Sequence, residues 1–223
     1  MNLQKALILF SCIYLTNCSS IQTNNIAPGY IDTYKAIKQA VFGYEDNTSI
    51  TRDLVNNIPY ASMTLQIGKG PTGLMILESI KEDELTWISA DPIYLVTQDG
   101  RIIKTEGLDN NLKDIIYHEV KFSEILQGKL KESSVYYSYS NPQLNNLKLD
   151  VKYIVKQESK ITILDKSYIL TLVQEEVTQN DLGWEFTNSY WVDRNGFVWK
   201  SEQTFLPQLP KFILQITKKN IQI

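Results

Sequence analysis

Two aromatic-rich hairpins hold the side chains best suited to contact another molecule. Gln98-Asp99-Gly100-Arg101 separates two runs of alternating apolar residues, and Asp193-Arg194-Asn195-Gly196 separates Ser189–Val192 from Phe197–Lys200. Asp-Gly and Asn-Gly favour tight turns between antiparallel strands, because glycine adopts a positive φ without strain. Aromatic rings on such strands either stack on sugar rings or fill a core, and Asp, Asn and Gln side chains hydrogen-bond hydroxyl groups. The hairpins carry no nucleophile pattern, so the chemistry they predict is binding.

The other residues with reactive side chains form no recognisable catalytic pattern. His118 is the only histidine, and no GxSxG motif or other nucleophile signature accompanies it. A glycosidase needs a pair of carboxylates at a defined separation, and sequence alone selects no pair. The candidates are Asp165, Glu175, Glu176 and Glu185. With one histidine and only two cysteines, a zinc site is not expected, and the sequence predicts no metal and no cofactor.

The glycine-rich stretch 68–73 invites comparison with a phosphate-binding loop. Such a loop requires Gly-Lys-Ser/Thr at the start of a helix. Here the stretch is followed by Leu74-Met75-Ile76-Leu77, which is typical of a strand. We therefore interpret residues 68–73 as the turn of a third hairpin.

The N-terminus is typical of an exported lipoprotein. Lys5 precedes Ala6–Leu15, an apolar stretch too short to cross a bilayer as a helix. Leu15-Thr16-Asn17-Cys18 then resembles a bacterial lipobox, which predicts a signal peptide over residues 1–17 and lipid attachment at Cys18. An ordinary signal peptide that happens to end near a cysteine is the alternative.

Two further residues bear on this anchor. Cys12 lies within the expected signal peptide, so Cys18 would be the only cysteine of the mature chain and could form no internal disulfide. Ser19, which follows Cys18, resembles the residue found in lipoproteins sorted to the outer membrane. We expect a lipid anchor on the periplasmic face of the outer membrane, with the membrane as a partner through Cys18.

Length and charge narrow the remaining possibilities. The chain of 223 residues has a net charge of −3, and its charged residues are scattered along the sequence. A nucleic-acid-binding domain normally shows a basic face or stripe, so nucleic acid is not expected as a partner. A domain of about 200 residues buries enough surface to form a core without disulfides.

Periodicity predicts a polar tether over residues 18–27 and one β-rich domain over residues 28–223. A helix is expected over residues 28–43, a short helical turn capped by Ser49 or Thr51 through Asn56, and a short helix or loop crossing over residues 108–116. Alternating apolar residues predict strands at 60–67, 74–77, 93–98, 102–105, 136–139, 147–155, 161–164, 168–173, 184–192, 197–200 and 212–216. The expected fold is mainly β: a large antiparallel meandering sheet, barrel-like or a sandwich, with a short N-terminal helix packed on it.

Several of these motifs together resemble the YjbF/GfcB family of lipoproteins linked to capsule and exopolysaccharide production. They are the lipobox, Pro59-Tyr60-Ala61-Ser62, Trp87 with Asp99-Gly100-Arg101 and Thr105–Leu108, and Tyr190-Trp191-Val192 with Asn195–Ser201, Gln203 and Pro207. The resemblance covers nearly the whole mature chain. It implies an outer-membrane lipoprotein of a polysaccharide-secretion system, with a large antiparallel β fold and no catalytic residues to transfer.

The residues of the two hairpins are the candidates for a shared binding surface, with maintenance of the fold as the alternative role. They are Trp87, Asp99, Gly100, Arg101, Thr105, Trp191, Asn195, Gly196, Trp199 and Gln203. The expected function is a non-catalytic binding or assembly factor in capsule or exopolysaccharide secretion, with polysaccharide and export-machinery proteins as partners. A periplasmic enzyme that modifies polysaccharide or lipid, for which Glu175, Glu176, Glu185 and His118 would be the residues to test, and a carrier of an apolar ligand remain the alternatives.

Overall fold

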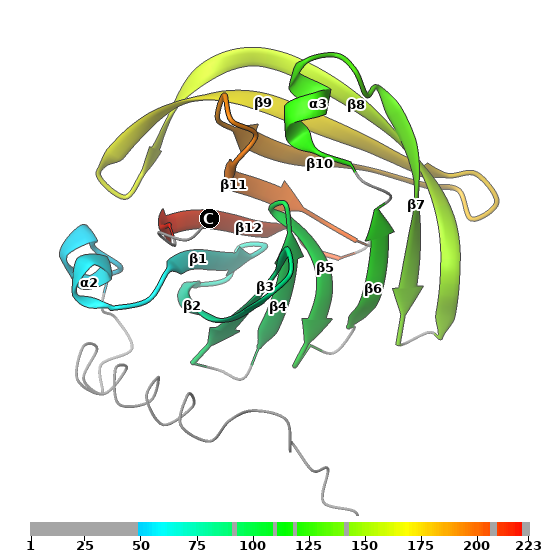
Figure 1. Ribbon diagram of the computed structural model, residues 1–223. Coiled ribbons are helices and arrows are strands. Elements are labelled where there is room, and N and C mark those ends of the chain that lie inside the picture. The colour runs from blue at the N-terminus through cyan, green and yellow to red at the C-terminus, as the bar shows by residue number, and fades with distance from the viewer. Residues whose placement is uncertain are drawn as a thin grey trace, which may run out of the picture.

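Twelve antiparallel strands form one strongly curled sheet (Figure 1). The structure is a computed structural model that describes residues 49–90, 93–108, 111–117, 120–140, 143–205 and 209–219. The strands are β1 (Ser62–Ile67), β2 (Thr72–Lys81), β3 (Glu84–Ser89), β4 (Tyr94–Gln98), β5 (Arg101–Glu106), β6 (Leu112–Tyr117), β7 (Glu132–Tyr139), β8 (Leu144–Ile163), β9 (Lys166–Gln179), β10 (Trp184–Val192), β11 (Val198–Gln203) and β12 (Phe212–Lys218). Their order in the sheet is β5-β4-β3-β2-β1-β12-β11-β10-β9-β8-β7-β6.

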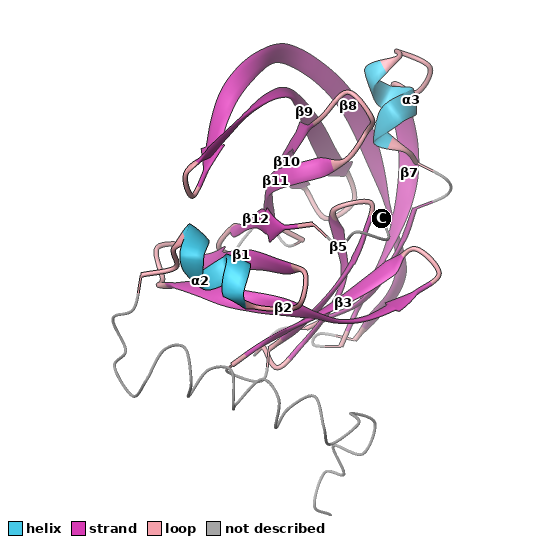
Figure 2. Ribbon diagram, turned by 60° about the vertical axis from the view of Figure 1, so that its left-hand side comes forward, coloured by secondary structure: helices cyan, strands magenta, loops and turns pink. Residues whose placement is uncertain are grey.

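The two edge strands, β5 and β6, lie side by side (Figure 1), so the sheet curls round and nearly closes into a barrel (Figure 2). No backbone ladder joins them among the described residues; side chains bridge this seam instead. The hydroxyl of Thr105 accepts a hydrogen bond from the backbone N–H of Leu112 (2.8 Å) and lies 3.4 Å from Oδ1 of Asn111. These contacts satisfy part of an otherwise unpaired edge.

The alternating pattern of the strands places one set of side chains inside the barrel and the other outside. In β1, Met63 and Leu65 belong to the interior core, whereas Thr64 and Gln66 point outward. β12 repeats the pattern, because Leu214 packs in the core and its neighbour Gln215 lies on the outer face. Side chains of large residues, among them Met75, Leu95, Tyr137 and Tyr190, fill the interior.

Strands β8 and β9 are longer than their neighbours and extend past the end of the sheet. β10 pairs with β9 only as far as Thr171, whereas the β8–β9 ladder continues to the pair Ile163 and Lys166. We call residues 159–170 the β8–β9 arm. Figure 1 shows the arm, in yellow, arching away from β10 so that its tip lies near α2.

Helix α2 (Arg52–Asn57) connects the tip of this arm to the sheet. Nε of Arg52 donates to Oδ1 of Asp165 at the tip (2.7 Å), and its Nη1 donates to the carbonyl of Thr217 at the end of β12 (2.5 Å). Val55 and Ile58 pack on outward side chains of β2 and β3. The helix therefore covers the outer face of the sheet.

Helix α3 (Phe122–Leu126) packs against β10 and the β10–β11 turn, with Phe122 and Ile125 buried. Its Phe122 ring lies 4.9 Å from the ring of Tyr190. Gly196 in the turn leaves room for Ser123, since an added Cβ would come within 3.0 Å of the Ser123 nitrogen. Among the described residues, no helix is long and apolar enough to span a membrane.

The predicted fold class is confirmed: the structure is mainly β, antiparallel and barrel-like, with a short helix before the first strand. Thr51 caps α2 as predicted, because its hydroxyl accepts a hydrogen bond from the backbone N–H of Leu54 (3.3 Å). Residues 68–71 form the turn of the β1–β2 hairpin, which confirms the turn interpretation. The helix predicted over residues 28–43 lies outside the described residues.

Two predictions about strands were wrong. Residues 108–116 were expected to form a helix or a loop crossing, but Leu112–Tyr117 is strand β6. A bulge between Leu112 and Asp114 puts Leu112 and Ile115 in the core, and this spacing of three resembles helical periodicity. The strands predicted at 147–155 and 161–164 are parts of one strand, β8, because the bulge between Val155 and Glu158 interrupts the alternation without ending the ladder.

Candidate functional site

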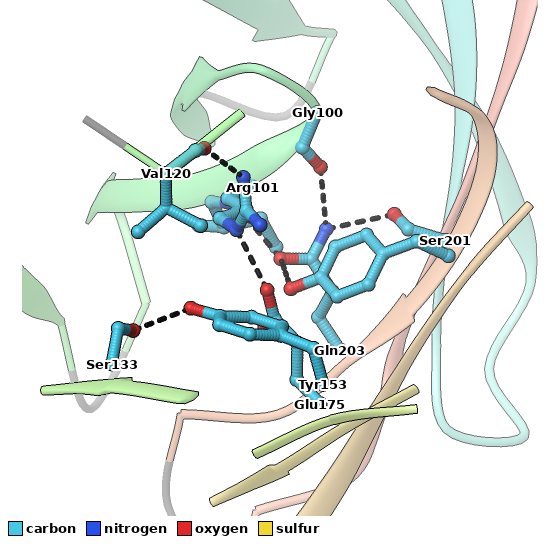
Figure 3. Close-up of polar contacts among 10 residues, drawn as sticks. Gly100, Arg101, Val120, Ser133, Tyr153, Glu175, Ser201 and Gln203 are labelled. Atoms are coloured by element: carbon cyan, nitrogen blue, oxygen red, sulfur yellow. Dashed lines mark hydrogen bonds and ion pairs between the residues drawn. The ribbon is translucent and has the colours of Figure 1, made fainter. Parts of the chain in front are cut away.

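An ion pair between Arg101 and Glu175 lies in the barrel interior (Figure 3). Nε of Arg101, on β5, donates to Oε1 of Glu175, on β9, over 2.7 Å, and the two side chains are 2% and 0% exposed. Nη1 of Arg101 also donates to the carbonyl of Val120 (3.1 Å). The guanidinium carbon lies 3.9 Å from the centre of the Phe122 ring. The pair therefore joins β5, β9 and the segment that leads into α3.

Gln203, on β11, connects the two predicted hairpin motifs. Its Oε1 accepts a hydrogen bond from the backbone N–H of Ile102 (2.9 Å) and one from the hydroxyl of Tyr190 (3.3 Å). Its Nε2 donates to the carbonyl of Gly100 (2.9 Å) and to the hydroxyl of Ser201 (2.7 Å). One amide side chain thus holds the turn of the first hairpin against both strands of the second.

Gly100 makes this close approach sterically possible. It has a φ of +76°, and a Cβ added there would lie 2.5 Å from Cβ of Val198. Only glycine combines this backbone conformation with such a contact. The Asp-Gly signal of the sequence therefore has two roles, one in the turn and one in packing.

Burial and charge together shift the pKa values of the groups around the ion pair. Desolvation, reinforced by the negative charge of Glu175, holds the pKa of Tyr117, Tyr137 and Tyr190 well above its ordinary value. The same causes raise the pKa of Tyr153 to about 12. Burial alone would lower the pKa of Arg101, but the carboxylate of Glu175 raises it above its ordinary value.

The ion pair is not fully hydrogen-bonded. Nη2 of Arg101 and Oε2 of Glu175 are buried, and neither has a hydrogen-bond partner among the described residues. Hydrogen bonds to a buried charged group offset the free-energy cost of removing that group from water. Because two atoms of this pair lack such bonds, less of this cost is offset. The pair therefore cross-links β5 and β9 in the interior, away from solvent.

The structure places four of the predicted surface residues inside the protein, so they do not form an external binding surface. Trp87, Arg101, Thr105 and Gln203 are each less than 5% exposed. Nε1 of Trp87 donates to the hydroxyl of Thr97 (2.9 Å), which satisfies its polar atom in the core. The sequence pattern groups these residues as one surface, because both faces of these strands carry large side chains. Alternation alone then does not show which face points into the core.

The other predicted surface residues lie on or near the outside. Asp99 and Asn195 are exposed at the two turns. Trp191 and Trp199 are partly exposed, and Nζ of Lys200 lies 4.2 Å from the centre of the Trp191 ring. Nε1 of Trp199 donates to Asp193 (3.0 Å), and its ring stacks on Tyr168 of the β8–β9 arm (4.3 Å between centroids). The second hairpin therefore also supports the arm.

Among the carboxylates considered for catalysis, Glu175 is separated by the sheet from Glu176 and Glu185. Glu175 points into the interior, whereas Glu176 and Glu185 are exposed on the other face. Asp165 is engaged by Arg52 at the arm tip, and this hydrogen bond lowers its pKa. No cluster of potential metal ligands occurs in the described ranges, and His118 lies outside them.

Glu175 is the central residue whose role sequence reasoning missed. A signal for it exists, because Val173, Glu175 and Val177 alternate and both valines are fully buried. A carboxylate at an inward position needs a cation nearby. Nothing in the sequence shows that this cation is Arg101, 74 residues earlier.

The chain matches known lipoproteins along most of its length. It is 27% identical over 210 residues to the uncharacterized lipoprotein YjbF of Escherichia coli K12, covering 89% of each chain. It is 24% identical over 185 residues to the uncharacterized lipoprotein GfcB of the same organism, covering 81% of this chain and 82% of GfcB. The crystal structure of the hypothetical lipoprotein YmcC from E. coli K12 has the same fold, with a TM-score of 0.72 and 22% identity over 85% of this chain and 96% of that chain.

The family model for the group 4 capsule polysaccharide lipoproteins GfcB and YjbF matches residues 34–217. This range includes both hairpins, the ion pair and Gln203. The match covers most of the chain, and the structural likeness to YmcC independently supports the fold. The chain therefore belongs to the YjbF family of group 4 capsule polysaccharide lipoproteins.

Proposed function

We propose that this protein is a lipid-anchored accessory factor in capsule or exopolysaccharide secretion that acts by binding and not by catalysis. The family match over residues 34–217 carries the proposal, because the family is described as capsule polysaccharide lipoproteins. The lipobox supports a signal peptide over residues 1–17, lipid attachment at Cys18, a tether over residues 18–27 and a single domain over 28–223. Ser19 supports the periplasmic face of the outer membrane as the location.

The geometry supports binding over the alternatives. The charged pair of the interior is neutralised and serves as a cross-link, and Glu176 and Glu185 lie on the face opposite Glu175. An apolar-ligand carrier needs a cavity for its ligand, but large side chains occupy the described interior. The outer face carries Trp191, Lys200 and exposed polar turn residues, which suit contact with polysaccharide or with proteins of the export machinery.

The anchor is tested by replacing Cys18 with serine. We expect metabolic labelling with a palmitate analogue to mark the wild-type protein but not Cys18→Ser, which should move from the outer-membrane fraction to the soluble periplasmic fraction. Cys12→Ser is the matched control and should be labelled and anchored normally. Labelling of Cys18→Ser, or its retention in the outer membrane, would contradict the proposed anchor.

The accessory role is tested in polysaccharide-producing cells that lack the gene. We expect loss of secreted polymer, restored by the wild-type protein, and polysaccharide or export components should co-purify with the protein from detergent-solubilised membranes. The double variant Glu176→Gln and Glu185→Gln probes the enzyme alternative; we expect normal secretion, whereas an altered polymer would support an enzyme. Unaltered secretion in the deletion strain together with no co-purifying partner would exclude the accessory role.

A further inference from the structure

A pocket of about 300 Å³ lies on the outer face of the sheet, between β1, β2, β12 and the tip of the β8–β9 arm. Thr64 and Gln66 of β1 and Gln215 of β12 form its floor, since outward residues of paired strands share one face. Leu164 at the arm tip and Ile50, which precedes α2, form its walls. The pocket is separate from the buried ion pair, because Met63 and Leu65 of the same strand point to the opposite side of the sheet.

The lining is uncharged and rich in groups that both donate and accept hydrogen bonds. Ser49 and Thr72 add two hydroxyl groups to those of the floor, and Ile213 adds a third aliphatic side chain. Hydroxyl and amide groups pair with the hydroxyl groups of a sugar in either direction, whereas aliphatic side chains contact its C–H faces. No Asp, Glu, Lys or Arg of the described residues lines the pocket, which disfavours an ionic ligand.

Polar groups of the floor are available to a ligand. Thr64 is 93% buried, since its exposed fraction is 7%, and it lines the pocket from the outer face of β1. Nε2 of Gln66 donates to the carbonyl of Gly70 (3.0 Å), which fixes this side chain in the pocket floor. A largely buried hydroxyl that lines a pocket is well placed to bind a ligand hydroxyl, because folding has already removed most of the water around it.

We infer that this pocket binds one uncharged sugar unit of a polysaccharide; the inference rests on the proposed function and gives it a site. A volume near 300 Å³ is at the small end of the range for small-molecule sites, about 300–1,000 Å³, and suits a single sugar or a disaccharide. Lys200 pairs with Gln215, and Trp191 pairs with Lys200 across the next ladder. A polymer held in the pocket can therefore extend along the same outer face over Lys200 and Trp191. The predicted surface residue Trp191 would then contact a sugar unit next to the pocket.

The test is ligand-observed saturation-transfer NMR on the full-length protein in deuterated detergent. The probes are the methyl glycosides of glucose, galactose and N-acetylglucosamine, with methyl glucuronide as the charged comparison. We expect saturation of at least one neutral glycoside and a weaker effect on the glucuronide. Thr64→Val and Gln215→Leu should each weaken binding about tenfold, because each removes one hydrogen-bonding group with little change in shape.

Thr187→Val, on the outer face of β10 away from the pocket, is the matched control and should leave binding unchanged. Unchanged thermal unfolding of all three variants shows that they fold. The inference would be overturned if no neutral glycoside bound, or if the glucuronide bound equally well. It would also be overturned if binding were unchanged in both pocket variants. If polysaccharide still co-purifies with the protein in any of these cases, the accessory role stands and only the assigned site is wrong.

Discussion

The ion pair between Arg101 and Glu175 cross-links β5 and β9 in the barrel interior. Both side chains are almost fully buried, and each retains one unpaired polar atom among the described residues. Two buried charges tolerate each other only as a pair, since a single charge left in the interior is strongly unfavourable. The pair therefore makes the stability of the fold sensitive to either residue.

Replacing Arg101 with methionine should lower the free energy of unfolding by about 3–5 kcal/mol, because Glu175 is then left without a partner. The double variant Arg101→Met, Glu175→Leu should recover most of this loss. Urea-induced unfolding measures both values. Arg194→Met is the control, since Arg194 forms an exposed pair with Glu158 (3.6 Å) and should cost less than about 1 kcal/mol. Equal losses for Arg101→Met and Arg194→Met would contradict a stabilising role of the buried pair.

Three desolvated tyrosines should make the protein unfold at alkaline pH. The pKa of Tyr117, Tyr137 and Tyr190 is higher in the folded protein than in the unfolded chain, where it is about 10. Their contribution to stability is therefore complete below about pH 10 and is lost as the pH rises above it. Thermal unfolding midpoints between about pH 8 and pH 11 measure the effect.

Tyr137→Phe should reduce the steepness of this alkaline decline, because it removes one ionisable group that the folded state keeps protonated. Tyr60→Phe, at a partly exposed position outside the barrel interior, is the control. A midpoint that stays constant through pH 11, or a decline equally steep in Tyr137→Phe, would argue that these hydroxyl groups ionise freely in the folded protein.

At the scale of elements, the two hairpins act as one unit because their turns and strands are in direct contact. The β4–β5 turn packs on Val198 of β11, and Gln203 hydrogen-bonds both hairpins. The second hairpin in turn carries Trp199, on which Tyr168 of the β8–β9 arm stacks. A local change at the first turn should therefore affect residues distant in sequence.

Gly100→Ala should destabilise the protein more than Gly183→Ala. Both positions have a positive φ, but an added Cβ meets Val198 at position 100 and nothing within 4 Å at position 183. We expect about 1–2 kcal/mol for the backbone conformation at either site and a further 1–3 kcal/mol for the clash at position 100. Denaturant unfolding gives the difference, and Val198→Gly, which removes the clashing Cβ and both methyl groups, should cost less in the Gly100→Ala background than in the wild type. Similar losses at the two glycines would show that the close packing does not matter.

At the scale of the whole molecule, the barrel is closed by side chains at the seam between β5 and β6. Thr105 accepts a hydrogen bond from the N–H of Leu112, and this contact stands where a ladder hydrogen bond would stand in a closed barrel. The interior pair Arg101–Glu175 spans the same barrel from β5 to β9. Closure therefore relies on a few polar contacts, while the rest of the sheet is joined by continuous ladders.

Thr105→Val should weaken this seam, because Leu112 loses its acceptor and valine keeps the shape of threonine. We expect a loss of about 1–3 kcal/mol in the free energy of unfolding and faster amide hydrogen exchange in Leu112–Tyr117 than in β10. Thr105→Ser, which keeps the hydroxyl, should behave like the wild type. Exchange that rises equally in β6 and β10 would indicate global destabilisation instead of seam opening.

The sequence by itself determined the fold class, most strands and the turns, because strand alternation and Asp-Gly or Asn-Gly turns are local signals that depend on a few neighbouring residues. It also contained both hairpin motifs through which the chain resembles its family. It failed where local patterns were altered by bulges, as in β6 and β8. A bulge shifts the alternation by one residue and makes a strand look like a helix or like two strands.

Only the tertiary structure decided which faces of the strands are covered and which distant residues meet. Curling of the sheet brought β5 next to β6 and turned Trp87, Arg101, Thr105 and Gln203 inward. It paired Arg101 with Glu175 and brought Leu164 over Thr64 and Gln215 to form a pocket. These contacts join strands that are far apart in the chain. The sequence does not predict them, because burial depends on how the whole sheet closes, and no local stretch of residues specifies that closure.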